Sequence, residues 1–347
     1  MGDDHKLTDT PLSSIGWTSH FALQLTDDEP LAPARVIEVQ RSHMTVLGSA
    51  APLTLTTRES TGDYVVGDWL LHDGARAKRR LSPLSEIARL GGPTGRQLIA
   101  ANVDTMAIVT SCNADFNVAR LERYLAIANA AGCVPLMLLT KADQTDDPER
   151  YLEQARALSP GVTTLALDAR DLDEATQLNA WAGPGQTLAL VGTSGVGKTT
   201  LQNALTGMSE LTQAVREDDA RGRHTTTYRA LRPTLAGGWL IDTPGMRELG
   251  LTDAAAGIAA TFADIGELAA RCRFNDCTHE TEPGCAVQAA IAAGVLDPAR
   301  LARQQKLTRE DARNTEAWHE RHARARGGAK ASRAGRERSQ HKRGGPA

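Results

Sequence analysis

The chain is poor in aromatic residues and has no long hydrophobic run. Phe, Trp and Tyr together make up 4% of its 347 residues, so the core has to be built mainly from aliphatic side chains. The longest apolar runs, such as VPLMLL at residues 134–139, are far too short to cross a bilayer. The polar start of the chain offers no hydrophobic signal segment. We therefore expect a cytoplasmic protein without membrane association.

Charge is unevenly distributed along the chain. The formal net charge is −3, but the segment from Arg321 to Ala347 holds nine Lys or Arg residues against one acidic residue. That segment carries +8, which leaves −11 for the remainder. A basic segment rich in Gly, Ala and Arg predicts a disordered tail over residues 319–347. Such a tail either contacts a polyanion or only keeps the protein in solution.

Hydrophobic periodicity divides the rest of the chain into four parts. Residues 1–32 are polar and without a clear period, and we expect them to be flexible. Residues 33–92 contain short strand-like runs with no helix between them, which predicts a small β-barrel, either a scaffold or a binding module. Residues 93–251 alternate strands and helices, which predicts a doubly wound α/β domain. Residues 252–318 predict a helical domain around a cysteine cluster.

The same patterns predict individual elements. Strands are expected at residues 35–39, 64–71, 105–109, 135–139, 187–191 and 239–241. Helices are expected at residues 118–131, 254–272 and 287–307.

Residues 192–199 (GTSGVGKT) match the phosphate-loop pattern G-x-x-x-x-G-K-[ST]. An expected strand precedes them and a helical stretch follows, which disfavours a simple turn. The glycines let backbone N–H groups close around phosphate oxygens at the positive end of the helix dipole. Lys198 should reach the β- and γ-phosphates, and the Thr199 hydroxyl should ligate Mg²⁺. The predicted phosphate-binding residues are Gly192, Thr193, Ser194, Gly195, Val196, Gly197, Lys198, Thr199 and Thr200.

Two further segments fit a switch role around the phosphates. Asp242 follows an expected strand, where its carboxylate can hold Mg²⁺, and the Gly245 backbone N–H can sense the γ-phosphate. Between this D-x-x-G pattern and the phosphate loop lies GRHTTT at residues 222–227. The Thr226 hydroxyl there is predicted to complete the Mg²⁺ shell, and a plain polar loop is the alternative.

Thr140-Lys141-Ala142-Asp143 resembles the guanine motif [NT]-K-x-D. The Asp143 carboxylate can accept the N1–H and N2 amino hydrogens of guanine, which adenine does not offer, and the Lys141 stem can pack on the base. This motif precedes the phosphate loop, whereas in ordinary GTPases it follows the D-x-x-G segment. A circularly permuted chain can assemble the same sheet. The segment from Asp242 then leads into the C-terminal helices, so loss of the γ-phosphate can move a whole domain.

Three of the five cysteines lie close to one histidine in the sequence. Cys272, Cys277, His279 and Cys285 form the pattern C-x4-C-x-H-x5-C. Three thiolates and an imidazole complete a tetrahedral shell without an open position, which predicts one structural Zn²⁺. In a cytoplasmic protein such a cluster favours metal over disulfides, and unligated buried thiols are the alternative.

In these motifs and their order, the chain resembles the RsgA (YjeQ) family of circularly permuted GTPases in bacterial small-subunit biogenesis. The matching stretches are residues 101–104, 123–125, 140–143, 192–199, 222–227, 242–245 and the cysteine cluster. The resemblance implies an N-terminal OB-fold, a permuted GTPase domain with GTP and Mg²⁺, and a C-terminal zinc domain. It also implies binding to the small (30S) ribosomal subunit and its 16S rRNA during late maturation. Hydrolysis would be stimulated by that subunit and coupled to release or a checkpoint.

Three positions depart from the family pattern. Thr140 stands where the family usually has Asn, and it lacks the amide that braces the phosphate loop. The fifth guanine-contact motif, expected near Leu165–Ala169, is eroded to LALDA. Met246 occupies the place of a water-orienting Gln, so another group or the partner must orient the water. With Lys198, the catalytic candidate that the family implies is His224, and a structural or RNA-facing histidine is the alternative.

The motifs leave three hypotheses for function. The first is an RNA-stimulated GTPase that checks or releases small-subunit intermediates. The second is a nucleotide-gated binding module with incidental turnover, which Met246 favours. The third is a P-loop ATPase or kinase, against which Asp143 argues. We expect the protein to act as a monomer.

Overall fold

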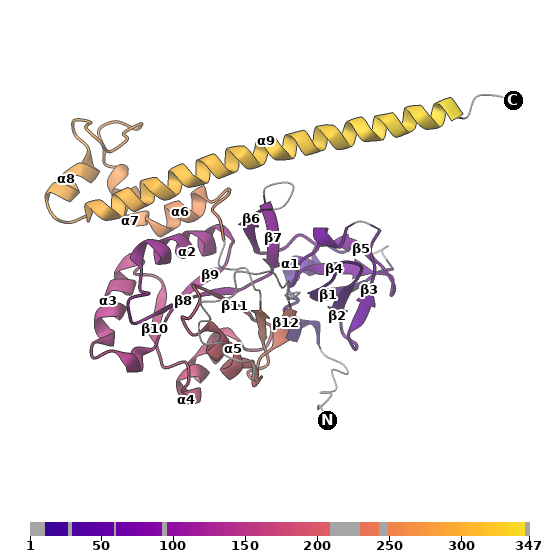
Figure 1. The fold of residues 1–347 in the computed structure, drawn as a ribbon, viewed down its shortest axis with the longest axis horizontal. Coiled ribbons are helices and arrows are strands. Elements are labelled where there is room, and N and C mark those ends of the chain that lie inside the picture. Colours follow the sequence, from indigo (N-terminus) through magenta and orange to yellow (C-terminus); the bar gives the residue numbers. More distant parts are fainter. Residues whose placement is uncertain are drawn as a thin grey trace, which may run out of the picture.

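The computed structural model describes residues 11–26, 30–58, 60–91, 96–208, 230–242 and 249–343. For Leu90, Arg96, Asp242 and residues 321–343 it describes the backbone alone. Figure 1 shows a β-barrel beside an α/β domain, with the C-terminal helices lying over the α/β domain. The last helix extends well past the rest of the molecule.

Five short strands form the N-terminal barrel. Strand β1 pairs with both β2 and β4, β2 pairs with β3, and β4 pairs with β5. A parallel bridge between Thr56 and Arg76 closes β3 onto β5. The expected small barrel is therefore confirmed, and five strands is also the number in an OB-fold. The strands are β1 (Ala32–Val39), β2 (Met44–Leu47), β3 (Leu53–Leu55), β4 (Trp69–His72) and β5 (Ala77–Arg80).

The expected flexible segment 1–32 is wrong for residues 11–26. This stretch forms the short helices η1 (Leu12–Ile15) and α1 (Ser19–Ala22). Ile15 and Phe21 are each 1% exposed, and the Phe21 ring lies 5.7 Å from the ring of Trp69 in the barrel. A few large side chains without a regular period still bury apolar surface, which periodicity does not detect.

A buried arginine joins this segment, the barrel and the α/β domain. Arg35 is 1% exposed. Its Nη1 donates to the Ile15 carbonyl at 2.7 Å, and its Nη2 donates to the Asn102 carbonyl and to Thr187 Oγ1, both at 2.8 Å. Burial lowers the pKa of Arg35 to about 10, although the negative charges of Asp104 and Asp68 act to raise this pKa. The barrel is therefore fixed to the α/β domain by a buried guanidinium group that is hydrogen-bonded to both.

A hairpin of β6 (Glu86–Leu90) and β7 (Arg96–Ala101) spans the expected boundary between residues 92 and 93. Its first strand also contacts the α/β domain, because the Glu86 N–H donates to the Ala131 carbonyl at 3.1 Å. The boundary is therefore misplaced, since both strands of one hairpin belong to the same unit.

The α/β domain is built on a sheet in the order β10-β9-β8-β11-β13-β12. The first five strands are parallel and β12 is antiparallel. The expected strands in this domain are confirmed with small shifts at their ends. The strands are β8 (Thr105–Ser111), β9 (Val134–Thr140), β10 (Thr163–Ala166), β11 (Thr187–Val191), β12 (Ala230–Pro233) and β13 (Trp239–Asp242).

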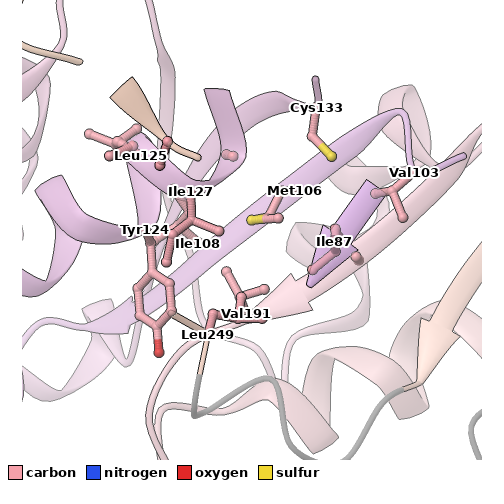
Figure 2. Close-up of a cluster of buried hydrophobic side chains, with 14 of the residues drawn as sticks. Ile87, Val103, Met106, Ile108, Tyr124, Leu125, Ile127, Cys133, Val191 and Leu249 are labelled. Carbon is pink, nitrogen blue, oxygen red and sulfur yellow. The ribbon is translucent and has the colours of Figure 1, made fainter. Parts of the chain in front are cut away.

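Helices cover both faces of this sheet, as expected for a doubly wound domain. Helix α2 (Val118–Ala130) matches the predicted helix and begins where the Asn117 side chain accepts the Arg120 N–H at 3.0 Å. Figure 2 shows the α2 side chains Tyr124 and Ile127 beside Ile108 of β8. Alternate residues of the strands pack instead with α5 (Lys198–Thr206) on the other face. The remaining helices of this domain are α3 (Pro148–Leu158) and α4 (Leu172–Ala175), with short turns η3 (Ala142–Gln144) and η4 (Thr176–Trp181).

Each of the two long helices expected near the C-terminus is broken into two. The helices are α6 (Ala255–Thr261), α7 (Ala263–Ala269), α8 (Ala286–Ala292) and α9 (Pro298–Arg343). Gly294, with φ 72°, lies in the turn between α8 and α9. None of the described helices is both long and apolar enough to cross a membrane.

The expected disordered tail at 319–347 is wrong up to Arg343, because α9 continues that far. Arg and Ala are the commonest residues of its last turns, and both residue types favour helix. Extending an existing helix also avoids the cost of a new nucleus. A high charge and low hydrophobicity therefore did not prevent order in this segment.

Candidate nucleotide and zinc sites

The phosphate loop and the guanine motif emerge at the same edge of the sheet. The loop follows β11 and leads into α5, and Thr140 ends β9. Both strands are parallel to β8, which lies between them. Ligands of open α/β sheets bind at the carboxyl ends of such strands. The topology therefore brings together two motifs that the sequence separates.

The phosphate loop has a backbone that its glycines permit. Gly192 has φ 145°, and a Cβ there would lie 2.2 Å from the Val109 carbonyl oxygen. Lys198 Nζ donates to the Gly192 carbonyl at 2.8 Å and also to the Thr193 carbonyl. The ammonium group of Lys198 is thus held over the loop in which phosphates are expected. Ser194 is exposed at the loop tip.

Thr140 connects the two motifs directly. Its side chain is fully buried, and Oγ1 lies 2.7 Å from the Val196 carbonyl and 3.0 Å from the Thr110 carbonyl. A hydroxyl carries one proton, so it donates to one of these oxygens at a time. Thr140 lacks the longer amide of Asn, but its hydroxyl reaches the phosphate loop directly.

The guanine motif carries an ion pair that no sequence pattern indicates. Lys141 has φ 57° and turns the chain after β9, which places Asp143 in η3. Arg170 Nη2 donates to Asp143 Oδ2 at 2.5 Å and to Asp168 Oδ2 at 3.0 Å. Hydrogen bonds from the Arg170 side chain and backbone lower the pKa of Asp168. Arg170 directly follows the segment in which the fifth guanine-contact motif was expected.

A second arginine reaches the phosphate loop from α2. Arg120 Nη1 lies 3.4 Å from Thr193 Oγ1. In the sequence Arg120 is one of three charged residues of this helix, and no motif distinguished it. It adds positive charge near the loop.

Part of the predicted magnesium shell lies outside the described residues. Thr199 stands in the first turn of α5, and the backbone of Asp242 ends β13, which is parallel to β11. A hydroxyl and a carboxylate at this sheet edge are oxygen ligands of the kind that Mg²⁺ prefers. The Asp242 side chain and all of His224, Thr226 and Gly245 are outside the described part of the chain.

The four predicted zinc ligands converge in space. Their ligand atoms all lie within 4.8 Å of one another. His279 Nδ1 is 3.7 Å from Cys272 Sγ and 3.5 Å from Cys285 Sγ, and those two sulfurs are 3.9 Å apart. A tetrahedral site with ordinary Zn–S and Zn–N bonds requires about 3.6–3.8 Å between such atoms. Cys277 completes the set, so the residues fit a Zn²⁺ ion.

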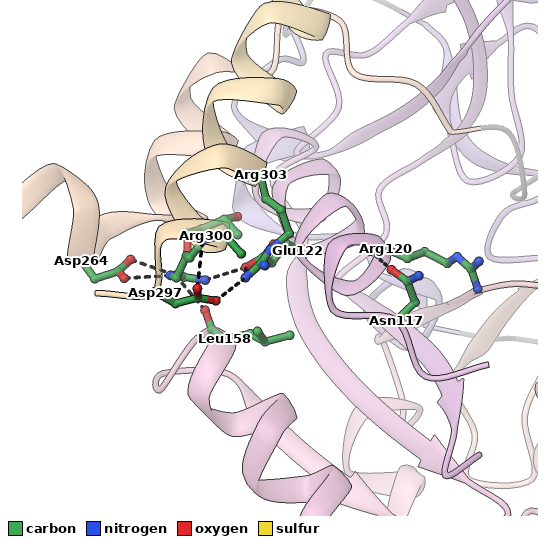
Figure 3. A network of polar contacts seen from close by, with 10 residues as sticks. Asn117, Arg120, Glu122, Leu158, Asp264, Asp297, Arg300 and Arg303 are labelled. Atoms are coloured by element: carbon green, nitrogen blue, oxygen red, sulfur yellow. Dashed lines mark hydrogen bonds and ion pairs between the residues drawn. The ribbon is translucent and has the colours of Figure 1, made fainter. Parts of the chain in front are cut away.

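A buried ionic network fixes the C-terminal helices to the α/β domain (Figure 3). Glu122 of α2 is fully buried. Its Oε1 accepts from Arg300 Nη1 at 2.9 Å, and its Oε2 accepts from Arg303 Nε at 2.5 Å. Arg300 also donates to both oxygens of Asp264 at 2.8 Å. We call Glu122, Asp264, Arg300 and Arg303 the interdomain network.

The segment that follows the D-x-x-G motif is anchored at both sides of this joint. Leu249 and Leu251 are 4% and 0% exposed, and Figure 2 shows Leu249 near Tyr124 in the core beneath α2. The Ala254 N–H donates to Asp311 Oδ1 of α9 at 3.0 Å. A displacement of this segment would therefore act on both α2 and α9.

Taken together, a parallel sheet with a phosphate loop after one strand and an earlier guanine motif at the same edge defines a circularly permuted P-loop GTPase. A family model described as RsgA GTPase matches residues 82–252, and this range includes the β6–β7 hairpin. The small ribosomal subunit biogenesis GTPase RsgA of Mesorhizobium japonicum is 51% identical, over 88% of this chain and 91% of its own length. RsgA 2 of Vibrio parahaemolyticus is 45% identical over 94% of each chain. The chain belongs to the RsgA family of GTP hydrolases.

Two solved structures share the fold. YjeQ from Thermotoga maritima has a TM-score of 0.62 at 22% identity and covers 80% of this chain and 97% of its own. YloQ, described as a circularly permuted GTPase, has a TM-score of 0.59 at 22% identity and covers 82% and 96%. At this identity the likeness supports the common architecture alone.

Proposed function

We propose that this protein hydrolyses GTP in the cytoplasm as a monomer, bound to the small ribosomal subunit during late maturation. The names of its relatives motivate the ribosomal role. The observation that carries the nucleotide assignment is the contact of Thr140 with Val196 at 2.7 Å. It supports the proposal that the guanine motif and the phosphate loop form the two ends of one site.

Within this site, each group has a separate task. The phosphate loop and Lys198 bind the phosphates, while Asp143 accepts hydrogen bonds from guanine and the Lys141 stem packs on it. Thr199, Thr226 and Asp242 would hold Mg²⁺, which supplies charge neutralisation at the β- and γ-phosphates.

His224 would accept a hydrogen bond from the attacking water, because the thioether of Met246 cannot do so. We further propose that the subunit stimulates hydrolysis by ordering this part of the site. Loss of the γ-phosphate would then shift the segment containing Leu249 and Leu251 against α2 and α9. That shift would release the protein or report a completed step.

Basic surfaces on two domains support contact with 16S rRNA. A groove on the barrel is lined by Arg58, Arg76 and Lys78 together with Tyr64. The far part of α9 carries most of the positive charge of the chain end. Several phosphate contacts of this kind predict binding that weakens steeply as salt rises.

The decisive test is steady-state GTP turnover with and without purified small subunits. The subunits should raise the rate of wild type, and Lys198→Ala should abolish turnover while Arg156→Ala, on the exposed face of α3, leaves it unchanged. If subunits bind but do not raise the rate, the protein is a nucleotide-gated binding module and the proposed stimulation is wrong.

Base selectivity is tested by competition between GTP and ATP and by Asp143→Asn. The amide of Asn can donate to the C2 carbonyl of xanthine, so this variant should lose GTP affinity and gain affinity for xanthosine triphosphate. Tighter binding of ATP than of GTP to wild type would contradict the guanine assignment.

A further inference from the structure

Arg170 is held in a defined position beside the proposed guanine acceptor. It follows β10, the strand next to β9, so it comes from the same sheet edge as Asp143. Besides the ion pair with Asp143, its backbone N–H and Nε donate to Asp168 Oδ1 at 2.9 and 3.1 Å. Asp168 is itself fixed, because its N–H donates to Glu174 Oε2 at 2.6 Å. Although 63% exposed, Arg170 is therefore tethered by the loop that carries it.

The guanidinium group offers Asp143 the same kind of donors as guanine does. A guanidinium presents planar, forked N–H groups to a carboxylate, and guanine presents its N1–H and N2 amino group in a similar plane. Asp143 Oδ2 already accepts a charged N–H at 2.5 Å. That oxygen is a poorer acceptor for guanine while it is hydrogen-bonded to Arg170.

We propose that Arg170 is an intramolecular competitor for guanine at Asp143 and thereby sets the affinity of the site for GTP and GDP. Guanine displaces Arg170 from Asp143, and the arginine then keeps only its bonds to Asp168. The inference rests on the proposed function, because it takes Asp143 as the base acceptor. An arginine that competes in this way lowers nucleotide affinity and speeds nucleotide release.

Equilibrium binding of fluorescent GDP to the full-length protein tests the proposal. Arg170→Ala should bind GDP about two- to five-fold more tightly than wild type, since exposed ion pairs contribute modestly. The difference should shrink at high salt, because the competing ion pair is screened. Arg170→Lys keeps the positive charge but lacks the planar pair of N–H donors, so its GDP affinity should lie between those of wild type and Arg170→Ala.

Arg156→Ala is the matched control. Arg156 forms an exposed ion pair with Glu149 at 2.8 Å and is 53% exposed, but it lies on α3 and does not contact Asp143. Its loss should leave GDP affinity unchanged. If both variants bound GDP equally more tightly than wild type, the effect would not depend on the contact with Asp143 and the proposal would be overturned.

A second measurement separates competition from a structural role. In an Asp143→Asn background, assayed with xanthosine diphosphate, Arg170→Ala should have no effect because the carboxylate is gone. An unchanged or weaker GDP affinity of Arg170→Ala in the wild-type background would refute the proposal. Weaker binding would indicate that Arg170 contacts the bound base instead of competing with it. Equal binding of ADP and GDP to wild type would instead refute the proposed function itself.

Discussion

Replacing Glu122 by Gln should destabilise the protein by about 2–3 kcal/mol. Glu122 is fully buried between two arginines of α9, and breaking a buried ion pair usually costs about 3–5 kcal/mol because a charge is left unpaired. Here the cost is smaller, since Arg300 keeps both hydrogen bonds to Asp264. Gln also keeps the volume of Glu and one acceptor oxygen, so the loss is electrostatic and leaves no cavity.

Urea unfolding of the full-length protein, followed by tryptophan fluorescence, measures this effect. Trp318 lies on α9 and Trp239 on β13, so both sides of the joint are reported. Glu149→Gln, which breaks an exposed ion pair of α3, should shift the transition far less. If the two variants lose equal stability, the interdomain network does not hold the C-terminal helices on the α/β domain.

Three further predictions concern the network, the helix contact beneath it and the metal. Burial opposes ionisation of Asp264, but the hydrogen bonds and positive charge of Arg300 outweigh burial and lower the pKa of Asp264. The ion pair therefore stabilises the protein fully above about pH 4, and this stabilisation is lost as the pH falls through the pKa of Asp264 in the folded state. The stability difference between wild type and Asp264→Asn, measured by urea unfolding, should accordingly vanish in acid. Gly257→Ala should lower the free energy of unfolding by about 2–3 kcal/mol, because a Cβ at this position would lie 2.2 Å from the Ala126 carbonyl oxygen. The control Gly266→Ala should lower it far less, because a Cβ there meets no described atom within 4 Å. Cys285→Ser should abolish zinc binding in a metal assay and lower the helical circular dichroism signal, since structural zinc supplies folding energy; full retention of both would exclude a structural metal.

A last prediction concerns the contact between the two nucleotide motifs. Thr140→Val keeps the shape of the side chain but removes the hydroxyl that reaches Val196. A hydrogen bond of this kind contributes about 1 kcal/mol, so GTP affinity measured by titration should fall about five-fold. Unchanged affinity would mean that the contact does not shape the loop.

The sequence alone predicted candidate sites wherever the chemistry lies within a short stretch of chain. The phosphate loop, the guanine motif and the zinc ligands are each contained in a few neighbouring residues, because backbone turns and metal shells impose fixed spacings. The buried strands of the α/β domain were also predictable, since a strand covered on both faces is continuously apolar. Periodicity failed where burial depends on scattered side chains, as with Phe21, and where a charged helix extends a packed one, as with α9.

Only the tertiary structure showed which distant residues meet. The contact of Thr140 with the phosphate loop spans 56 positions, that of Arg170 with Asp143 spans 27, and that of Arg300 with Glu122 spans 178. Arg170, Arg300 and Glu122 belong to no sequence motif, and the motif that contains Thr140 and Asp143 does not show which distant residues they contact. The order in which parallel strands assemble, and the way α9 packs back on α2, decide these pairings, because contacts between elements depend on packing across the whole core.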